Sequence, residues 1–259
     1  MTDLLTLEGV NKAFGPVHVL HGVNFSVRPG EVVALVGDNG AGKSTLVKSI
    51  AGIHPIDSGT IRFNGEVVHL HDPKAASKLG IEVVYQDLAL ADNLDIVQNM
   101  YLGRERGSSW FMDEITMEEE ARKTLASLSV RTINSVRQPV SSLSGGQRQI
   151  VAIAKSVLWD SKVILLDEPT AALGVAQTKQ VLDLVRRLAE QGLGVVLISH
   201  NLGDVFEVAD RIAVLYLGQL VAQVPTSEVT QNQVVELITS GRSGELGVAR
   251  LDTASISAL

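Results

Sequence analysis

The sequence contains no cysteine, and aromatic residues fill only 4% of its 259 positions. Without a thiol, the chain can form no disulfide, hold no metal through thiolate and perform no cysteine-based catalysis. No apolar run approaches the roughly 18 residues that a membrane-spanning helix needs. The first residues also lack a basic stretch followed by an apolar one, so we expect no secretory signal. These absences predict a soluble, cytoplasmic protein that would meet a membrane only through a partner.

Positive charge is also scarce, because 22 Lys and Arg residues face 29 Asp and Glu residues, a net charge of −7. Proteins that bind nucleic acid over a broad surface carry a positive net charge, since phosphates are negative. The composition therefore argues against nucleic acid as a partner, while leaving room for a local basic patch. With 45% hydrophobic residues, the chain has the composition of an ordinary globular protein of one large domain or two lobes.

The most informative pattern is Gly-Asp-Asn-Gly-Ala-Gly-Lys-Ser-Thr at residues 37–45. It follows an apolar run at 32–36 and precedes apolar residues at helical spacing, so we predict a buried strand, a glycine turn and a helix. Glycines let backbone N–H groups turn toward a ligand, and a helix N-terminus attracts phosphate. A glycine turn that only joins strand to helix is the plainer alternative. The complete spacing instead favours a P-loop that binds a nucleoside triphosphate.

Each residue of this loop has an expected role. Lys43 would reach the β- and γ-phosphates, and the Ser44 hydroxyl would bind Mg²⁺. The remaining residues expected around the phosphates are Gly37, Asn39, Gly40, Ala41, Gly42 and Thr45.

Two carboxylates, Asp167 and Glu168, end the apolar run that begins at residue 163. Open α/β sheets bind ligands at the carboxyl ends of their strands. Beside a P-loop, Asp167 would help hold Mg²⁺, and Glu168 would orient or deprotonate an attacking water. The alternative is a charged strand end before the turn at Pro169.

Gln86 and His200 also follow predicted strands, at 81–85 and 195–198. A histidine at a strand end is more often a satisfied surface or core group, but its place at the same sheet edge favours a catalytic role. The Gln86 amide could contact Mg²⁺ or water, at the point where the predicted core gives way to helices. We therefore predict that both residues take part in catalysis.

Ser144, Gly145, Gly146 and Gln147 precede a helix predicted over 148–158. They could form only an N-cap and a loop, or a second anion-binding helix terminus. Two such termini would lie in different lobes, so we infer that the second serves a nucleotide held by another copy. Phe14 lies in a polar, turn-like setting, where its ring could stack on a base for about 1–3 kcal/mol or pack in the core.

The order of predicted elements gives the fold class. Strands at 5–10, 23–27, 32–36, 61–63 and 66–68 form a β-rich opening, helices fill 94–158, and strands at 163–166, 195–198 and 212–215 alternate with a helix at 175–190. This order predicts an α/β protein, a P-loop NTPase core of mostly parallel sheet with an antiparallel β subdomain and an inserted all-helical subdomain. We expect 1–86 and 160–224 to form the α/β core, 87–159 the helical subdomain, and 225–259 a C-terminal helix at 227–238 and a poorly ordered tail from Ser240.

Together the motifs resemble the ATP-binding subunit of ABC transporters. Walker A at 37–45, the Gln86 loop, the LSGGQ signature at 143–147, Walker B at 163–168 and the His200 switch occur in the order typical of that family. The resemblance implies two subunits that close head to tail around two ATP molecules. It also implies that Ser144, Gly145 and Gly146 contact the γ-phosphate held by the partner subunit's Lys43. Glu168 would be the catalytic base, His200 a γ-phosphate sensor and Phe14 the adenine contact.

Residues 71–76, 99–105 and 172–175 are similar to those of bacterial monosaccharide importers of the ribose, xylose and fructose type. This implies sugar uptake through a separate integral-membrane permease, with a periplasmic sugar-binding protein as an indirect partner. The chain would lie at the cytoplasmic face of the inner membrane beside a second ATPase subunit, which we expect to be identical. The helical insertion would receive the permease near residues 86–93. Two features are departures: many of those sugar ATPases carry two nucleotide domains in one chain, whereas this one carries one, and Gly174 stands in place of the usual aspartate.

Two other functions are weighed against this one. Soluble ABC-type ATPases that act on nucleic acid or the ribosome usually add coiled coils, tandem domains or basic arms, none of which the sequence contains. A non-catalytic nucleotide-binding regulator is disfavoured by the intact Glu168 and His200.

Overall fold

The computed structural model describes residues 3–107, 111–128 and 133–247. Its centre is a six-stranded sheet in which five neighbouring strands are parallel and the last, at one edge, is antiparallel. From edge to edge the strands are β10 (Gln219–Pro225), β9 (Arg211–Tyr216), β3 (Val32–Gly37), β8 (Gly194–Ile198), β7 (Val163–Asp167) and β6 (Ile81–Val84).

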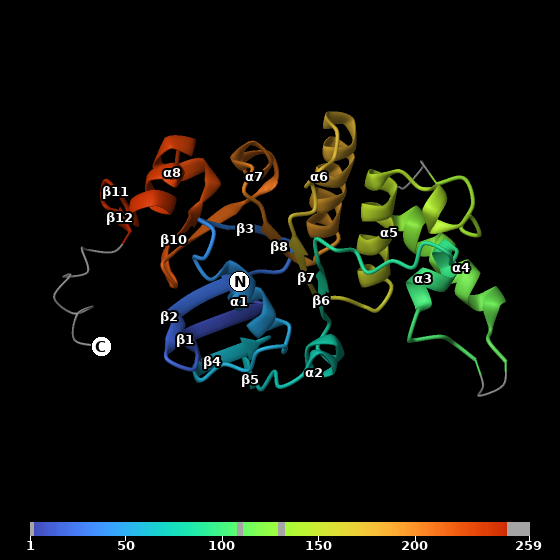
Figure 1. Cartoon of the computed structure of the whole chain (residues 1–259), viewed down its shortest axis with the longest axis horizontal. Helices are drawn as coiled ribbons and strands as arrows, with labels where there is room; N and C mark the ends of the chain where they lie inside the picture. Colours follow the sequence, from blue (N-terminus) through green and yellow to red (C-terminus); the bar gives the residue numbers. More distant parts are fainter. Residues whose placement is uncertain (1–2, 108–110, 129–132, 248–259) are drawn as a thin grey trace.

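A second, antiparallel sheet of four strands lies on one side of this sheet (Figure 1). Its strands are β2 (Val17–Val27), β1 (Leu5–Phe14), β4 (Ser58–Phe63) and β5 (Glu66–Val68). β1 and β2 extend well beyond the predicted 5–10 and 23–27. Register shifts between Leu7 and Ala13 break the alternation of apolar and polar residues, so the pattern ends before the strand does.

Alternate residues of the central strands enter two different cores. In β3, Val33 and Leu35 pack in a cluster with the antiparallel sheet and α1 (Lys43–Ile50). Val32, Ala34 and Val36 point the other way, into a cluster with the helices of the opposite face. Because both faces are covered, the strands are continuous apolar runs, which is why the sequence identified them.

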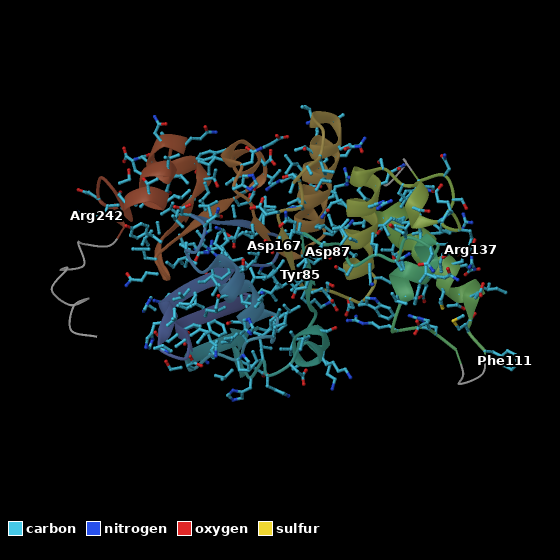
Figure 2. All side chains as sticks on the ribbon, in the orientation of Figure 1. Tyr85, Asp87, Phe111, Arg137, Asp167 and Arg242 are labelled. Carbon is cyan, nitrogen blue, oxygen red and sulfur yellow. The ribbon has the colours of Figure 1, made fainter. Side chains whose placement is uncertain are left out.

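The helices of the opposite face are α6 (Val175–Glu190), α7 (Leu202–Val208) and α8 (Gln231–Ser240) (Figure 1). At the β6 edge lie α3 (Ile96–Tyr101), α4 (Glu114–Ser127) and α5 (Gly145–Val157), and α2 (Pro73–Lys78) lies beside β6. The described residues between 87 and 159 contain no strand longer than a single bridge. Figure 2 shows Phe111 at the outer end of this helical part. This residue is 80% exposed.

Three boundaries correct the sequence prediction. The helix expected from 148 begins at Gly145, because Ser144 and Gln147 cap each other's backbone N–H groups. The last helix, expected over 227–238, is a 3₁₀ turn (Thr226–Glu228) followed by α8, which begins after its cap Thr230. Part of the tail expected to be poorly ordered forms a hairpin of β11 (Arg242–Ser243) and β12 (Leu246–Gly247), while 248–259 lie outside the described residues.

No helix among the described residues is long and apolar enough to cross a membrane.

Asn99 fixes the segment that follows Gln86 to α3. Its fully buried side chain accepts a hydrogen bond from Ala91 N (2.7 Å) and donates to Ala91 O (3.0 Å) and Asp95 O (2.9 Å). We predict that Asn99→Ala lowers the free energy of unfolding by roughly 2–4 kcal/mol, because buried backbone groups lose their partners. Urea denaturation measures this change. The exposed Asn232 in α8 gives the control, and an equal effect of Asn232→Ala would contradict the prediction.

Candidate active site

A cavity of about 770 Å³ opens where β3, β7 and β8 end, at the carboxyl edge of the parallel sheet. The pairing register explains why its residues meet there. Ile198 at the end of β8 pairs with Asp167 of β7 and with Leu35 of β3, so the three strands end at one level. The cavity gathers most of the predicted site residues, namely Gly37, Asn39, Gly40, Gly42, Lys43, Ser44, Thr45, Gln86, Asp167, Glu168 and His200.

The glycine loop joins β3 to the first turn of α1. Gly40 and Gly42 have φ of 80° and 104°, and a Cβ on Gly42 would lie 3.0 Å from the Leu20 side chain and 3.1 Å from Val19 O. These positions therefore require glycine. No described side chain caps α1, so the N–H groups of its first turn, whose residues line the cavity, have no side-chain cap. This arrangement fits an anion.

Lys43, the first residue of α1, folds back over the loop. Its Nζ donates to Gly37 O (2.7 Å) and Asp38 O (2.9 Å). Burial lowers the pKa of Lys43, although the negative charges of Glu168, Asp38 and Asp167 oppose this. An anion beside Nζ would favour the charged ammonium further, so the cavity suits a negatively charged ligand.

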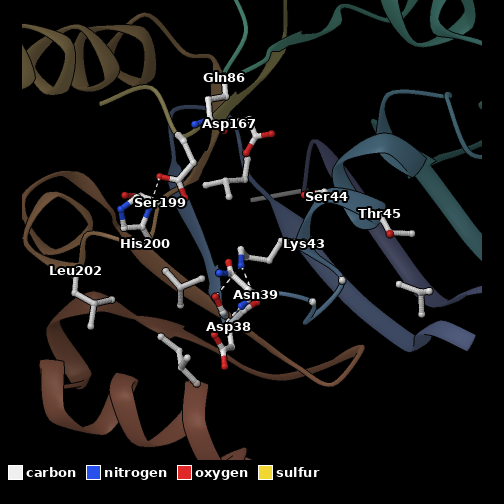
Figure 3. Close-up of a pocket in the computed structure, with 18 residues that line it drawn as sticks. Asp38, Asn39, Lys43, Ser44, Thr45, Gln86, Asp167, Ser199, His200 and Leu202 are labelled. Carbon is white, nitrogen blue, oxygen red and sulfur yellow. Dashed lines mark hydrogen bonds and ion pairs between the residues drawn. The ribbon is translucent and has the colours of Figure 1, made fainter. Parts of the chain in front are cut away.

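Three oxygen donors line the cavity above the loop: the Ser44 hydroxyl, the Asp167 carboxylate and the Gln86 amide (Figure 3). Gln86 reaches this place because Val84 of β6 pairs with Leu166 of β7. Burial raises the pKa of Tyr85, the residue before Gln86, and the negative charge of Asp167 adds to the effect. Burial raises the pKa of Asp167, with the negative charge of Glu168 adding to the effect. Hydroxyl, carboxylate and amide oxygens suit Mg²⁺, and a cation there would offset this destabilised charge.

Glu168 follows β7 with an unusual backbone. Its φ is +51°, uncommon for a non-glycine residue, and its N–H donates to Ile198 O of the neighbouring strand (3.0 Å). Its Oε2 lies 2.8 Å from His200 Nδ1, within hydrogen-bond distance. The Glu168 side chain is 16% exposed and that of His200 is 77% exposed, so the carboxylate is the sheltered member of the pair.

Phe14 does not line the cavity. It ends β1, is 44% exposed, and meets the His54 ring edge-on with the ring centroids 5.1 Å apart. Lys12 Nζ lies 5.4 Å from the centroid of the Phe14 ring. The ring is therefore not a core residue, and stacking on a base stays a prediction. Ala41 is likewise outside the lining, because its methyl group is buried in the core beneath the loop.

The predicted residues 144–147 lie at the start of α5, also outside the cavity. Their glycines have a packing reason within the chain itself. A Cβ on Gly145 would lie 3.3 Å from Leu173, and one on Gly146 would lie 3.0 Å from Gln177 Cβ of α6. Whether these residues also bind an anion stays a prediction.

Several residues that line the cavity could not be identified from the sequence. Val19 comes from β2, Leu202 from α7 and Ile238 from α8, and their apolar side chains carry no chemical motif. Asp38 and Ser199 also line the cavity. In the sequence they could have been found only through their position next to predicted site residues.

A parallel sheet with a glycine loop, a lysine and a carboxylate pair at its carboxyl edge defines a P-loop nucleoside triphosphatase. Residues 20–171 match the family model for ABC transporters. The chain belongs to the ATP-binding subunits of this family, as the motifs predicted, and the expected α/β fold is confirmed.

Relatives with assigned names are similar in sequence over nearly the whole chain. The xylose/arabinose import ATP-binding protein of Sulfolobus acidocaldarius is 46% identical, with 96% of this chain and 98% of that protein covered. The fructose import ATP-binding protein of Rhizobium meliloti is 43% identical, with 92% and 95% covered. An ATP-binding cassette of an ABC transporter solved in its ADP conformation has a TM-score of 0.79 and 25% identity, with 93% and 96% covered.

We predict that Lys43→Ala weakens ATP binding about 10- to 100-fold, because a charge-assisted contact to phosphate is worth roughly 1.5–3 kcal/mol. Titration calorimetry with ATP and Mg²⁺ measures the Kd. Lys74→Ala, which removes an exposed lysine of α2 that does not line the cavity, is the control and should change the Kd less than about twofold. Equal affinities for the wild type and Lys43→Ala would contradict the role of Lys43.

Proposed function

We propose that this chain hydrolyses ATP to drive sugar import through a separate membrane permease, paired with a second ATPase subunit. The observation that carries the enzymatic part is the 2.8 Å contact of Glu168 with His200 in the cavity that also holds Lys43. A base, an orienting partner for it and a phosphate-binding cation are the groups that phosphoryl transfer to water requires.

In this proposal the loop N–H groups and Lys43 hold the β- and γ-phosphates. Glu168 orients the attacking water and accepts its proton, and His200 holds the Glu168 carboxylate and senses the γ-phosphate. Mg²⁺, when bound by Ser44, Asp167 and Gln86, would neutralise charge on the phosphate oxygens. Phe14, at the end of β1, would offer its exposed ring to the adenine.

A second copy would complete the site. Ser144, Gly145, Gly146 and Gln147 begin α5 outside the cavity of their own chain. We assign them to the γ-phosphate held by the partner subunit's Lys43, where the N-terminus of α5 would add a favourable dipole. ATP would then lie between two subunits and hold them together.

Sugar import rests on the names of the relatives, which are import ATP-binding proteins for xylose/arabinose, fructose and ribose. We assign residues 1–86 and 160–224 to the nucleotide-binding core, 87–159 to a helical part that receives the permease, and 225–259 to a C-terminal unit. The chain would lie at the cytoplasmic face of the inner membrane, with a periplasmic sugar-binding protein as an indirect partner. The relatives and the net charge of −7 both disfavour a nucleic-acid partner.

Removing the base tests the enzymatic proposal. We predict that Glu168→Gln lowers kcat by at least about 100-fold, because a positioned general base contributes roughly 10²–10⁴. The Kd for ATP should stay within about threefold, since Lys43 and the loop are untouched. Phosphate release measures the rate, and Glu190→Gln, at the exposed end of α6, is the control. Hydrolysis by Glu168→Gln at the wild-type rate would disprove the assignment.

Isolation of the chain from the membranes of its own organism tests the transport proposal. We expect a permease of the sugar-importer type to copurify, and the complex in vesicles to take up a pentose or hexose only with ATP. A chain that brings down nucleic acid or ribosomes instead would overturn sugar import while leaving the ATPase assignment intact.

A further inference from the structure

Glu168 and His200 lie on separate loops, after β7 and β8, and their contact requires that the two loops keep a fixed distance. Besides the contact itself, a buried carboxylate joins these loops. Asp204 of α7 is only 7% exposed, and it does not line the nucleotide cavity.

Each oxygen of Asp204 holds one of the loops. Its Oδ2 accepts a hydrogen bond from Thr170 Oγ1 at 2.7 Å, and its Oδ1 accepts one from Asn201 Nδ2 at 2.9 Å. Thr170 comes two residues after Glu168, and Asn201 comes directly after His200. The bridge therefore runs from one catalytic loop to the other, one or two residues behind the reacting side chains.

The backbone around Glu168 is held in an unusual conformation. A φ of +51° at a non-glycine residue costs of order 1–3 kcal/mol unless its surroundings enforce it. On its N-terminal side, the Glu168 N–H is bound to Ile198 O. On its C-terminal side, the Thr170 hydroxyl is bound to Asp204, and hydrogen bonds to a buried charge are the strong ones.

Helix capping does not explain why a buried carboxylate stands at position 204. The N-cap of α7 is Asn201, whose Oδ1 accepts from Gly203 N at 2.9 Å. Asp204 lies in the first helical turn, where a carboxylate is favourable at the surface, yet its side chain is buried with both oxygens directed to other residues. A buried charge is costly unless it is bonded, so these two contacts are the reason it is tolerated.

We propose that Asp204 is a positioning residue for ATP hydrolysis, which sets the Glu168–His200 geometry by tying Thr170 to Asn201. This inference rests on the proposed function, in which Glu168 is the base. Asp204 lies outside the lining of the nucleotide cavity. Its loss should leave ATP binding intact and displace the base, and a displacement of about 1 Å can cost roughly 100-fold in rate.

Steady-state hydrolysis by the full-length chain tests the bridge. We expect Asp204→Ala to lower kcat about 10- to 100-fold, with KM for ATP within about threefold. Thr170→Val keeps the shape of the side chain but removes the hydroxyl, so it should lower kcat in the same direction. Thr170→Ser restores a hydroxyl and should recover kcat to within about threefold of wild type. Glu207→Ala, on the exposed side of α7, is the matched control.

A double variant distinguishes a positioning role of Asp204 from a general loss of structure. If Asp204 acts through Glu168, adding Asp204→Ala to Glu168→Gln should lower the residual single-turnover rate less than about twofold. A further large drop would show that Asp204 acts independently and would overturn the inference. Should Asp204→Ala fail to fold, the pair Thr170→Val and Thr170→Ser decides.

The outcomes also separate this inference from the proposed function. An unchanged kcat in Asp204→Ala and Thr170→Val, with Glu168→Gln inactive, overturns the bridge alone. A raised KM with unchanged kcat does the same, because it assigns Asp204 to nucleotide binding. If Glu168→Gln itself stays active, the proposed function fails.

Discussion

The site depends on the place of β8 between β3 and β7. Ile198 pairs with Leu35 on one side and with Asp167 on the other, so the glycine loop, the carboxylates and His200 all leave the sheet at one edge. Their sequence positions span more than 160 residues, and the parallel pairing of the strands brings them to one edge. The N–H of Glu168 donates to Ile198 O, and this hydrogen bond carries the alignment one residue beyond the strand.

The strands and the loops around this cavity are held in place by different interactions. The strands are buried on both faces, so the level at which they end is fixed by two cores rather than by the ligand. The loops hold the chemical groups in conformations that the sheet does not determine: positive φ at Gly40, Gly42 and Glu168, and Lys43 folded onto its own loop. The loops therefore need their own polar contacts, and Asn99 and Asp204 provide such contacts for the loops after β6, β7 and β8.

The sequence predicted the parts of the fold that repeat regularly. Buried strands are apolar runs, and the P-loop and the carboxylate pair are contiguous, so the five parallel strands and most of the cavity lining were identified. The antiparallel edge strand β10 was missed. Helix boundaries and side-chain contacts were harder to predict. The start of α5 at Gly145 was missed because glycine is a poor helix former, although Ser144 and Gln147 have the spacing of a capping box. Contacts between distant positions, such as Thr170 with Asp204 or Phe14 with His54, leave no pattern in a single sequence.

The start of α5 serves its own subunit before it serves any other. Ser144 caps the helix, and Gly146 lies against Gln177 so closely that a side chain there would push into α6. Gly145 faces Leu173 and Gly146 faces Gln177. Both partners come shortly after Thr170 in the sequence. A substitution in this segment thus perturbs intramolecular packing and the proposed intersubunit contact together. A defect caused by substitution at 144–147 therefore combines weaker folding of the single chain with weaker subunit pairing, and the stability of the lone chain separates the two.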